Sequence, residues 1–263
     1  MNILVSNDDG ILSNGIRALI EGLSPYHNVY VVAPDRERSA AAHSLTLHTP
    51  LRVEEVEPKY GAKKCWMTTG TPSDCVKLAI NAILSEDEKP DFVISGINHG
   101  PNLGADILYS GTVSCAMEGA MMGYPSISTS LASLRNNYED FMFASEFIAQ
   151  FLKRLDKYKI PSKTILNINI PALEKEDIAG IAITELGNRI ITDDYEKRID
   201  PRGKVYYWLA GKLINEPEDV STDIAAIRNN KISITPITYD MTRKNIMHEL
   251  ETSLCNENIC EWF

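Results

Sequence analysis

The sequence is short of positive charge. Its 26 Lys and Arg residues stand against 36 Asp and Glu residues, which gives a formal net charge of −10 at pH 7. An acidic surface repels phosphate backbones, so the composition argues against binding to nucleic acid or to an anionic membrane. An acidic protein that handles a phosphate compound needs a local positive element, either a metal ion or a helix N-terminus.

Long apolar segments and paired cysteines are also missing. No segment is long and apolar enough to span a bilayer, and the N-terminus lacks the basic region and apolar stretch of a secretory signal. The five cysteines are odd in number and include no CxxC pair, which is typical of a reducing compartment. We therefore expect a cytoplasmic protein in which Cys255 and Cys260 are neither paired nor bound to metal.

The first part of the chain alternates strand and helix signals. Short apolar runs predict buried strands at residues 3–5, 29–33 and 92–95, and apolar stripes of helical spacing lie at residues 16–23, 76–84, 113–121 and 141–155. Thr71 and Pro72 provide the start of the second helix. This rhythm predicts an α/β fold, a Rossmann-like doubly wound and mostly parallel sheet.

The character of the sequence changes near residue 165. Residues 165–170, 204–209 and 231–235 show period-two alternation, and residues 201–203 are typical of a turn. We expect an α/β core over residues 1–164. Residues 165–263 are expected to form a strand-rich hairpin elaboration and a C-terminal helical tail, within the same domain.

Three of the expected strands end in oxygen-rich turns. Asp8 and Asp9 follow the first, residues 35–39 with Ser39 follow the second, and residues 98–102 with Asn98 follow a later one. Parallel strands bring such turns to one edge of the sheet. Carboxylate, hydroxyl and amide oxygens favour Mg²⁺ or Mn²⁺ over zinc. Each turn taken alone is equally consistent with ordinary turn chemistry.

A fourth polar turn, Ser110, Gly111 and Thr112, directly precedes a helical stripe. Hydroxyls and free backbone N–H groups at a helix start can bind an anion. In isolation the turn would be no more than an N-cap. Beside a metal cluster it predicts a phosphate cradle, and the two together predict a metal-assisted phosphohydrolase.

Other polar and aromatic residues are weaker candidates. A histidine could protonate a leaving group. An arginine could steer an anion or pair with a neighbouring carboxylate. An aromatic cluster could stack on a base, although a packed strand is the favoured interpretation of that cluster. These residues are His43, His48, His99, Arg36, Arg38, Tyr206, Tyr207 and Trp208.

The ordered motifs resemble those of the SurE (survival protein E) family of metal-dependent nucleoside monophosphate phosphatases. The matching segments are ILVSNDDG (residues 3–10), VAPDRERS (32–39), GTPSDCV (70–76), SGINHGPN (95–102), YSGTV (109–113) and AMEGA (116–120), with weaker matches at residues 167–171, 206–208 and 233–236. The resemblance covers nearly the whole chain. Two departures are Asn229-Asn230, where a glycine is expected, and the glycine-free segment 40–42.

The resemblance implies one divalent cation per subunit, Mg²⁺ or Mn²⁺, held by Asp8, Asp9, Ser39 and Asn98. Asp8, Asp9 and Asn98 are then the catalytic residues, and either aspartate could be the base. Asn102, Ser110, Gly111 and Thr112 would line the phosphate pocket. The implied substrates are nucleoside 5′- and 3′-monophosphates, with short polyphosphates left open. The hairpin and C-terminal segment of residues 165–263 would assemble a homodimer or homotetramer.

Two other functions compete with this hypothesis. A non-catalytic nucleotide-binding or receiver-like signalling module would also have paired acidic residues after its first strand. It would need a phospho-acceptor Asp at the end of the central strand, where this chain has the SGIN of residues 95–98. A phosphatase with a covalent aspartyl intermediate would need Asp-x-Asp, and the Asp8-Asp9 pair has the wrong spacing.

Overall fold

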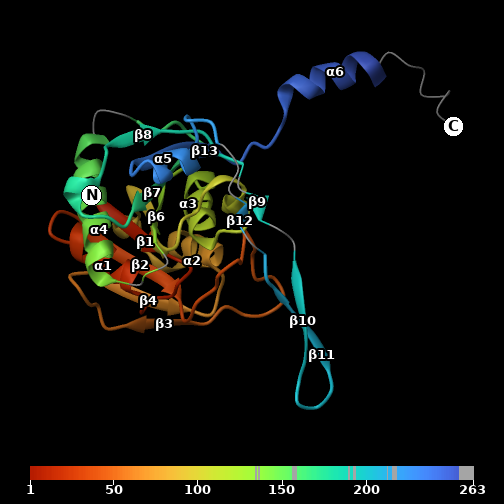
Figure 1. Cartoon of the computed structure of the whole chain (residues 1–263). Helices are drawn as coiled ribbons and strands as arrows, with labels where there is room; N and C mark the ends of the chain where they lie inside the picture. The colour runs from red at the N-terminus through yellow and green to blue at the C-terminus, as the bar shows by residue number, and fades with distance from the viewer. Residues whose placement is uncertain are drawn as a thin grey trace.

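The structure is a computed structural model and describes residues 1–133, 135, 137–155, 159–188, 190–191, 194–211, 213–214 and 218–254. One nine-stranded sheet runs through the molecule in the order β3-β4-β2-β1-β5-β6-β7-β13-β8 (Figure 1). Its strands are β1 (Asn2–Ser6), β2 (Asn28–Pro34), β3 (Val53–Val56), β4 (Lys64–Thr68), β5 (Phe92–His99), β6 (Ser126–Ala132), β7 (Thr164–Pro171), β8 (Ile181–Ile183) and β13 (Ile232–Thr238).

The strands of this sheet are parallel except at two places, where β3 pairs antiparallel with β4 and β13 pairs antiparallel with β7. The α-helices are α1 (Asn14–Leu23), α2 (Pro72–Leu78), α3 (Gly111–Met121), α4 (Tyr138–Leu155), α5 (Asp223–Arg228) and α6 (Lys244–Leu254). The prediction of a doubly wound, mostly parallel α/β sheet is confirmed.

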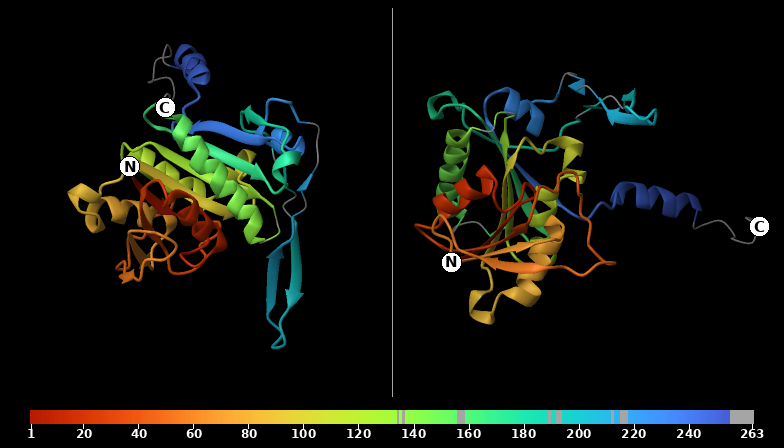
Figure 2. Two further views of the ribbon diagram at one scale, coloured as in Figure 1. Left: turned by 90° about the vertical axis from the view of Figure 1, so that its left-hand side faces the viewer. Right: turned by 90° about the horizontal axis from the view of Figure 1, so that it is seen from below.

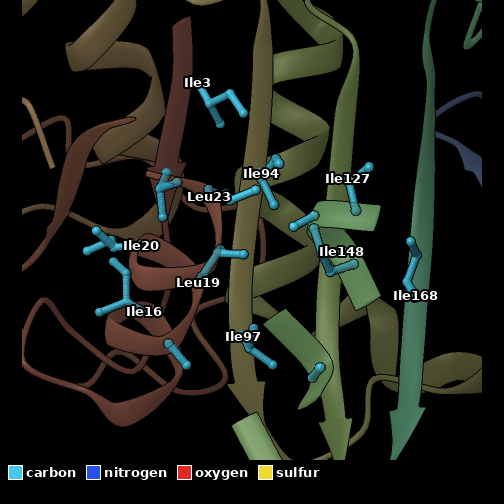
Figure 3. Close-up of a cluster of buried hydrophobic side chains, with 14 of the residues drawn as sticks. Ile3, Ile16, Leu19, Ile20, Leu23, Ile94, Ile97, Ile127, Ile148 and Ile168 are labelled. Atoms are coloured by element: carbon cyan, nitrogen blue, oxygen red, sulfur yellow. The ribbon is translucent and has the colours of Figure 1, made fainter. Parts of the chain in front are cut away.

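Helices cover both faces of the sheet (Figure 2). Alternate residues of β1 enter opposite cores: Ile3 and Val5 pack in the core formed with α1 and α4, and Leu4 packs in the core formed with α2. Figure 3 shows the first of these clusters, where Leu19 and Leu23 of α1 lie against the central strands. Burial on both faces explains why the central strands are continuous apolar runs.

Capping residues start the first two helices, and the start predicted at Thr71 and Pro72 is confirmed. Ser13 caps α1 by accepting a hydrogen bond from the backbone N–H of Ile16. Thr71 and Asp74 form a reciprocal capping box at the start of α2. The apolar stripe expected over residues 76–84 is not a single α-helix, because α2 ends at Leu78 and a π-helical turn follows over Ala79–Ile83.

Part of the later half joins the main sheet, and part projects from it. Strands β7, β13 and β8 extend the sheet, whereas β10 (Tyr195–Ile199) and β11 (Val205–Leu209) form an antiparallel hairpin that protrudes from the body (Figure 1). A second small pair joins β9 (Ile190–Ile191) to β12 (Leu213–Ile214). The expectation of a packed aromatic strand is wrong: Tyr207 and Trp208 are 58% and 60% exposed, and Tyr206 is also exposed, because none of the described residues covers the faces of the hairpin.

The described cysteines are all free thiols. Cys65, Cys75 and Cys115 are buried and form no disulfide. Cys255 and Cys260 lie outside the described residues, so the expectation about them stays a prediction. Of the helices in the described ranges, none combines the length and the apolar character that a membrane crossing requires.

The packing of α1 against the sheet leads to a prediction about stability. Leu19 is fully buried between α1 and the sheet, so Leu19→Ala should lower the free energy of unfolding by about 2–5 kcal/mol through lost burial and a residual cavity. Leu47→Ala removes the same atoms from a side chain that is mostly exposed, and it should change the free energy of unfolding by less than about 0.5 kcal/mol. Urea unfolding of both variants measures the difference, and equal losses would contradict this packing.

Candidate active site

The three oxygen-rich turns meet at one edge of the sheet. Strands β2, β1 and β5 are direct neighbours, with β1 in the middle and parallel to both. The chain order of the strands reverses at β1, and ligands of open α/β sheets bind at such switch points, beyond the carboxyl ends of the strands. The structure therefore places Asp8, Asp9, residues 35–39 and residues 98–102 in one region.

Asp8 is the buried member of the pair. Its side chain accepts hydrogen bonds from the Thr112 hydroxyl and from the backbone N–H groups of Gly111 and Thr112, at the N-terminus of α3. Its backbone carbonyl accepts from the Arg38 N–H at 2.7 Å. Burial raises the pKa of this carboxyl, and the hydrogen bonds from α3 act in the opposite direction.

Asp9 faces an open cavity. One carboxylate oxygen accepts the backbone N–H of His99 at 3.1 Å. Burial and the neighbouring charge of Asp8 raise the pKa of Asp9 to about 7. The cavity has a volume of about 390 Å³ and is lined by residues of these turns, among them Asp9, Arg36, Ser39 and His99, and by the start of α1 and Phe141 of α4.

Ser39 and Asn98 flank the two carboxylates from opposite sides. Ser39 lies on the loop after β2 and lines the cavity with Asp9, and its hydroxyl donates to Glu37 at 2.6 Å. Asn98 lies at the end of β5, where its side-chain N–H donates to the carbonyl of Gly100 at 2.8 Å. That bond uses the amide nitrogen of Asn98, so its oxygen is the atom available to a cation.

A bulge in β5 determines where Asn98 lies. The pairing register with β6 shifts between Ser95 and Asn98. Gly96 has a φ of +125°, and a Cβ atom there would lie 2.3 Å from the carbonyl oxygen of Thr129, so no other residue fits. The expectation that the strand ends at residue 95 is wrong, because β5 continues past the bulge to His99.

The turn before α3 is an N-cap that is also tied to Asp8. The Ser110 hydroxyl accepts the backbone N–H of Val113 at 3.1 Å. A Cβ atom on Gly111 would lie 2.7 Å from the Cβ of Asp8, so glycine is what allows the helix to approach the carboxylate. Thr112 is fully buried, and its hydroxyl points to Asp8.

Asn102 is part of a buried polar network. Its side-chain N–H donates to Ser130 at 2.8 Å, its backbone N–H donates to Asn169, and its carbonyl accepts from both Asn167 and Asn169. The two partner asparagines on β7 were missed as site residues. Their signal was two polar side chains inside a run of Ile and Leu, since polar residues at buried strand positions need dedicated partners.

The weaker candidates separate clearly. Arg36 and His99 line the cavity beside Asp9. Arg38 forms an ion pair with Asp35 at 3.2 Å, so it pairs with a neighbouring carboxylate, the alternative to steering an anion. His43 lies instead against Glu118, and His48 is exposed.

The residues present fit a hard divalent cation. Two adjacent carboxylates lie together, and no ion pair between described residues involves either of them. In the described part of the chain, no three His, Cys, Asp or Glu side chains gather as a metal site. A cation at Asp8 and Asp9 would therefore need neutral oxygens as well, and Ser39 and Asn98 are the ones at hand.

Comparison with known proteins gives consistent matches. The family model for survival protein SurE matches residues 3–193. A protein of Thermosynechococcus vestitus named 5′-nucleotidase SurE is 52% identical over 92% of each chain, and one of Cyanothece sp. with the same name is 50% identical over 97% of this chain and 96% of its own. The crystal structure of the SurE protein from Aquifex aeolicus has a TM-score of 0.82 at 41% identity, covering 95% of this chain and 98% of the other.

The raised pKa of Asp9 predicts an unusual pH dependence without metal. From pH 5 to 8 the unfolded chain carries Asp9 ionised, whereas the folded state keeps its proton up to about pH 7. The folded state thus binds more protons, so this residue lowers stability as pH rises. Asp9→Asn should therefore gain stability over the wild type progressively from about pH 4 to pH 7, and the gain should level off above pH 7. Urea unfolding in EDTA measures this, and parallel pH profiles of the two proteins would contradict it.

Proposed function

This chain belongs to the survival protein SurE family, and on that premise we propose that it is a metal-dependent 5′-nucleotidase. Such an enzyme hydrolyses a nucleoside monophosphate to a nucleoside and phosphate. The observation that carries the proposal is the pair Asp8–Asp9 at the switch point of the sheet, with raised pKa values and no cationic partner among the described residues. 3′-Monophosphates and short polyphosphates are further candidate substrates.

In this proposal Asp8, Asp9, Ser39 and Asn98 hold one Mg²⁺ or Mn²⁺ ion. The bound cation supplies positive charge to a phosphate ester and lowers the pKa of a water molecule. Asp8 is held in place by Thr112 and the start of α3, so its carboxylate is oriented before any ion binds. Such preorganisation from outer groups is a regular feature of metal sites.

The residues at the start of α3 would bind the phosphate. The Ser110 hydroxyl accepts from Val113, and its own hydrogen remains able to donate to a phosphate oxygen. Asn102 holds its loop in register through Asn167 and Asn169. Asp9 faces the open cavity and can accept a proton from an attacking water there, and Asp8 is the alternative base.

Three wider features belong to the same proposal. The exposed apolar hairpin β10–β11 would assemble a homodimer or homotetramer together with the C-terminal segment. Residues 1–164 would carry the metal and phosphate sites, and residues 165–263 the assembly elements. The free thiols of the described cysteines are consistent with a cytoplasmic location.

The direct test is phosphate release from 5′- and 3′-nucleoside monophosphates with Mn²⁺, with Mg²⁺ and with EDTA. We expect metal-dependent release that EDTA abolishes. Asp8→Asn and Asp9→Asn should each lower kcat/KM by at least about tenfold to a hundredfold, the loss typical for changes even in outer-shell groups. Nucleotide binding without phosphate release under any metal would favour the non-catalytic nucleotide-binding module. Wild-type turnover in both variants at saturating metal would contradict the site assignment.

Thr112 offers a finer test of the geometry. Thr112→Val keeps the shape of the buried side chain but removes the hydrogen bond to Asp8, so kcat should fall by about tenfold to a hundredfold. Thr112→Ser keeps the hydroxyl and serves as the matched control. Steady-state kinetics of both variants decide the matter, and equal activity of the two would show that this hydroxyl does not orient Asp8.

A further inference from the structure

A buried carboxylate lies in α3 away from the reacting groups. The Glu118 side chain is only 3% exposed, two helical turns beyond Thr112. One of its oxygens lies 2.8 Å from Nε2 of His43, and the other lies 2.8 Å from Nζ of Lys77. The His43 hydrogen bond is the main cause that lowers the pKa of Glu118, against the opposing effect of burial. The carboxylate is therefore charged and shared between two partners.

His43 belongs to the loop that carries Ser39. This loop connects β2 to β3 and contains no helix or strand of its own. Ala40 and Ala42 have φ values of +55° and +51°, in the left-handed region that costs energy for residues other than glycine. A loop in such a conformation persists only where its surroundings fix it.

Two backbone contacts fix this loop on the site side. The N–H of Arg38 donates to the carbonyl of Asp8 at 2.7 Å, just before Ser39. The N–H of Ala42 donates to the carbonyl of Tyr109 at 3.1 Å, just before Ser110. The His43 side chain also contacts Glu118 in the interior of α3, and the next residue, Ser44, accepts a hydrogen bond from the Thr71 hydroxyl at 2.7 Å. The segment that carries Ser39 is thus held between the Asp8 strand and the helix that starts at Gly111.

We propose that Glu118 and His43 form a positioning pair that holds the strained segment 39–43 against α3 and so keeps the Ser39 hydroxyl beside Asp9. The inference rests on the metal site of the proposed function. Neither residue lines the cavity that contains Asp9, so both act through the loop and neither is a catalytic residue. Loss of the pair should leave the fold intact and weaken the site.

Lys77 provides a matched control inside the same cluster. It contacts the same carboxylate at the same distance, but it lies on α2 and its side chain is 48% exposed. Removing Lys77 also takes one partner from the buried charge. It leaves the hydrogen bond between His43 of the loop and Glu118 in place. A merely structural role for Glu118 predicts similar effects of the two losses, whereas a positioning role predicts that only His43 matters to the metal.

The test is calorimetric titration of the full-length protein with Mn²⁺ alone, comparing His43→Ala, His43→Gln and Lys77→Met with the wild type. His43→Ala should weaken Mn²⁺ binding by about tenfold or more, as outer-shell losses do at other metal sites. His43→Gln keeps an N–H that can reach Glu118 and should restore most of the affinity. Lys77→Met should bind Mn²⁺ like the wild type. Urea unfolding of each variant shows that the fold is retained.

The outcomes separate this inference from the proposed function. Mn²⁺ binding without phosphate release would overturn the nucleotidase and still test the pair. Wild-type Mn²⁺ affinity in His43→Ala would overturn the pair, and so would equal losses in His43→Ala and Lys77→Met. A wild-type protein that binds no Mn²⁺ would remove the basis of both.

Discussion

Two carboxylates at the end of a buried strand are the constraint on which the site depends. Asp8 and Asp9 follow β1, the middle one of the three strands. Burial disfavours the charge of both carboxyl groups, and the charge of Asp8 adds to this effect at Asp9. The protein offers Asp8 oriented N–H groups and a hydroxyl from α3, which are dipoles and not a cation. The described residues therefore compensate the pair only in part, and in the proposed function a divalent ion would supply the missing positive charge.

The conformation of the surrounding backbone allows α3, β5 and the loop with Ser39 to lie close to this pair of carboxylates. Gly111 lets α3 approach Asp8 to a distance that a Cβ atom would block, and Gly96 allows the bulge that carries Asn98 forward along β5. On the other side, the loop with Ser39 is held in a left-handed conformation at Ala40 and Ala42. Local strain and close contacts of this kind are concentrated where a site must be preorganised.

The sequence predicted the sheet class, the helix starts and the meeting of the turns, because apolar periodicity and capping residues are local signals. It did not reveal strand β6 or the bulge in β5. Ser126, Ser128 and Ser130 make β6 look polar, and only the packed neighbours show that these side chains are buried. The sequence also could not reveal which residues contact Asn102 and Glu118. Asn169 and His43 lie far from them in the chain, and side-chain contacts over such separations leave no periodic pattern.

The antiparallel pairing of β13 with β7 has a consequence for synthesis on the ribosome. Residues 164–171 emerge early, yet the strand that covers their free edge, Ile232–Thr238, comes more than sixty residues later. At roughly 5–20 residues per second, β7 then waits for seconds with the backbone N–H and C=O groups of one edge unpaired. Open strand edges recruit other chains. The nascent protein is thus most exposed to misassembly during that interval, when a chaperone would have the most to protect.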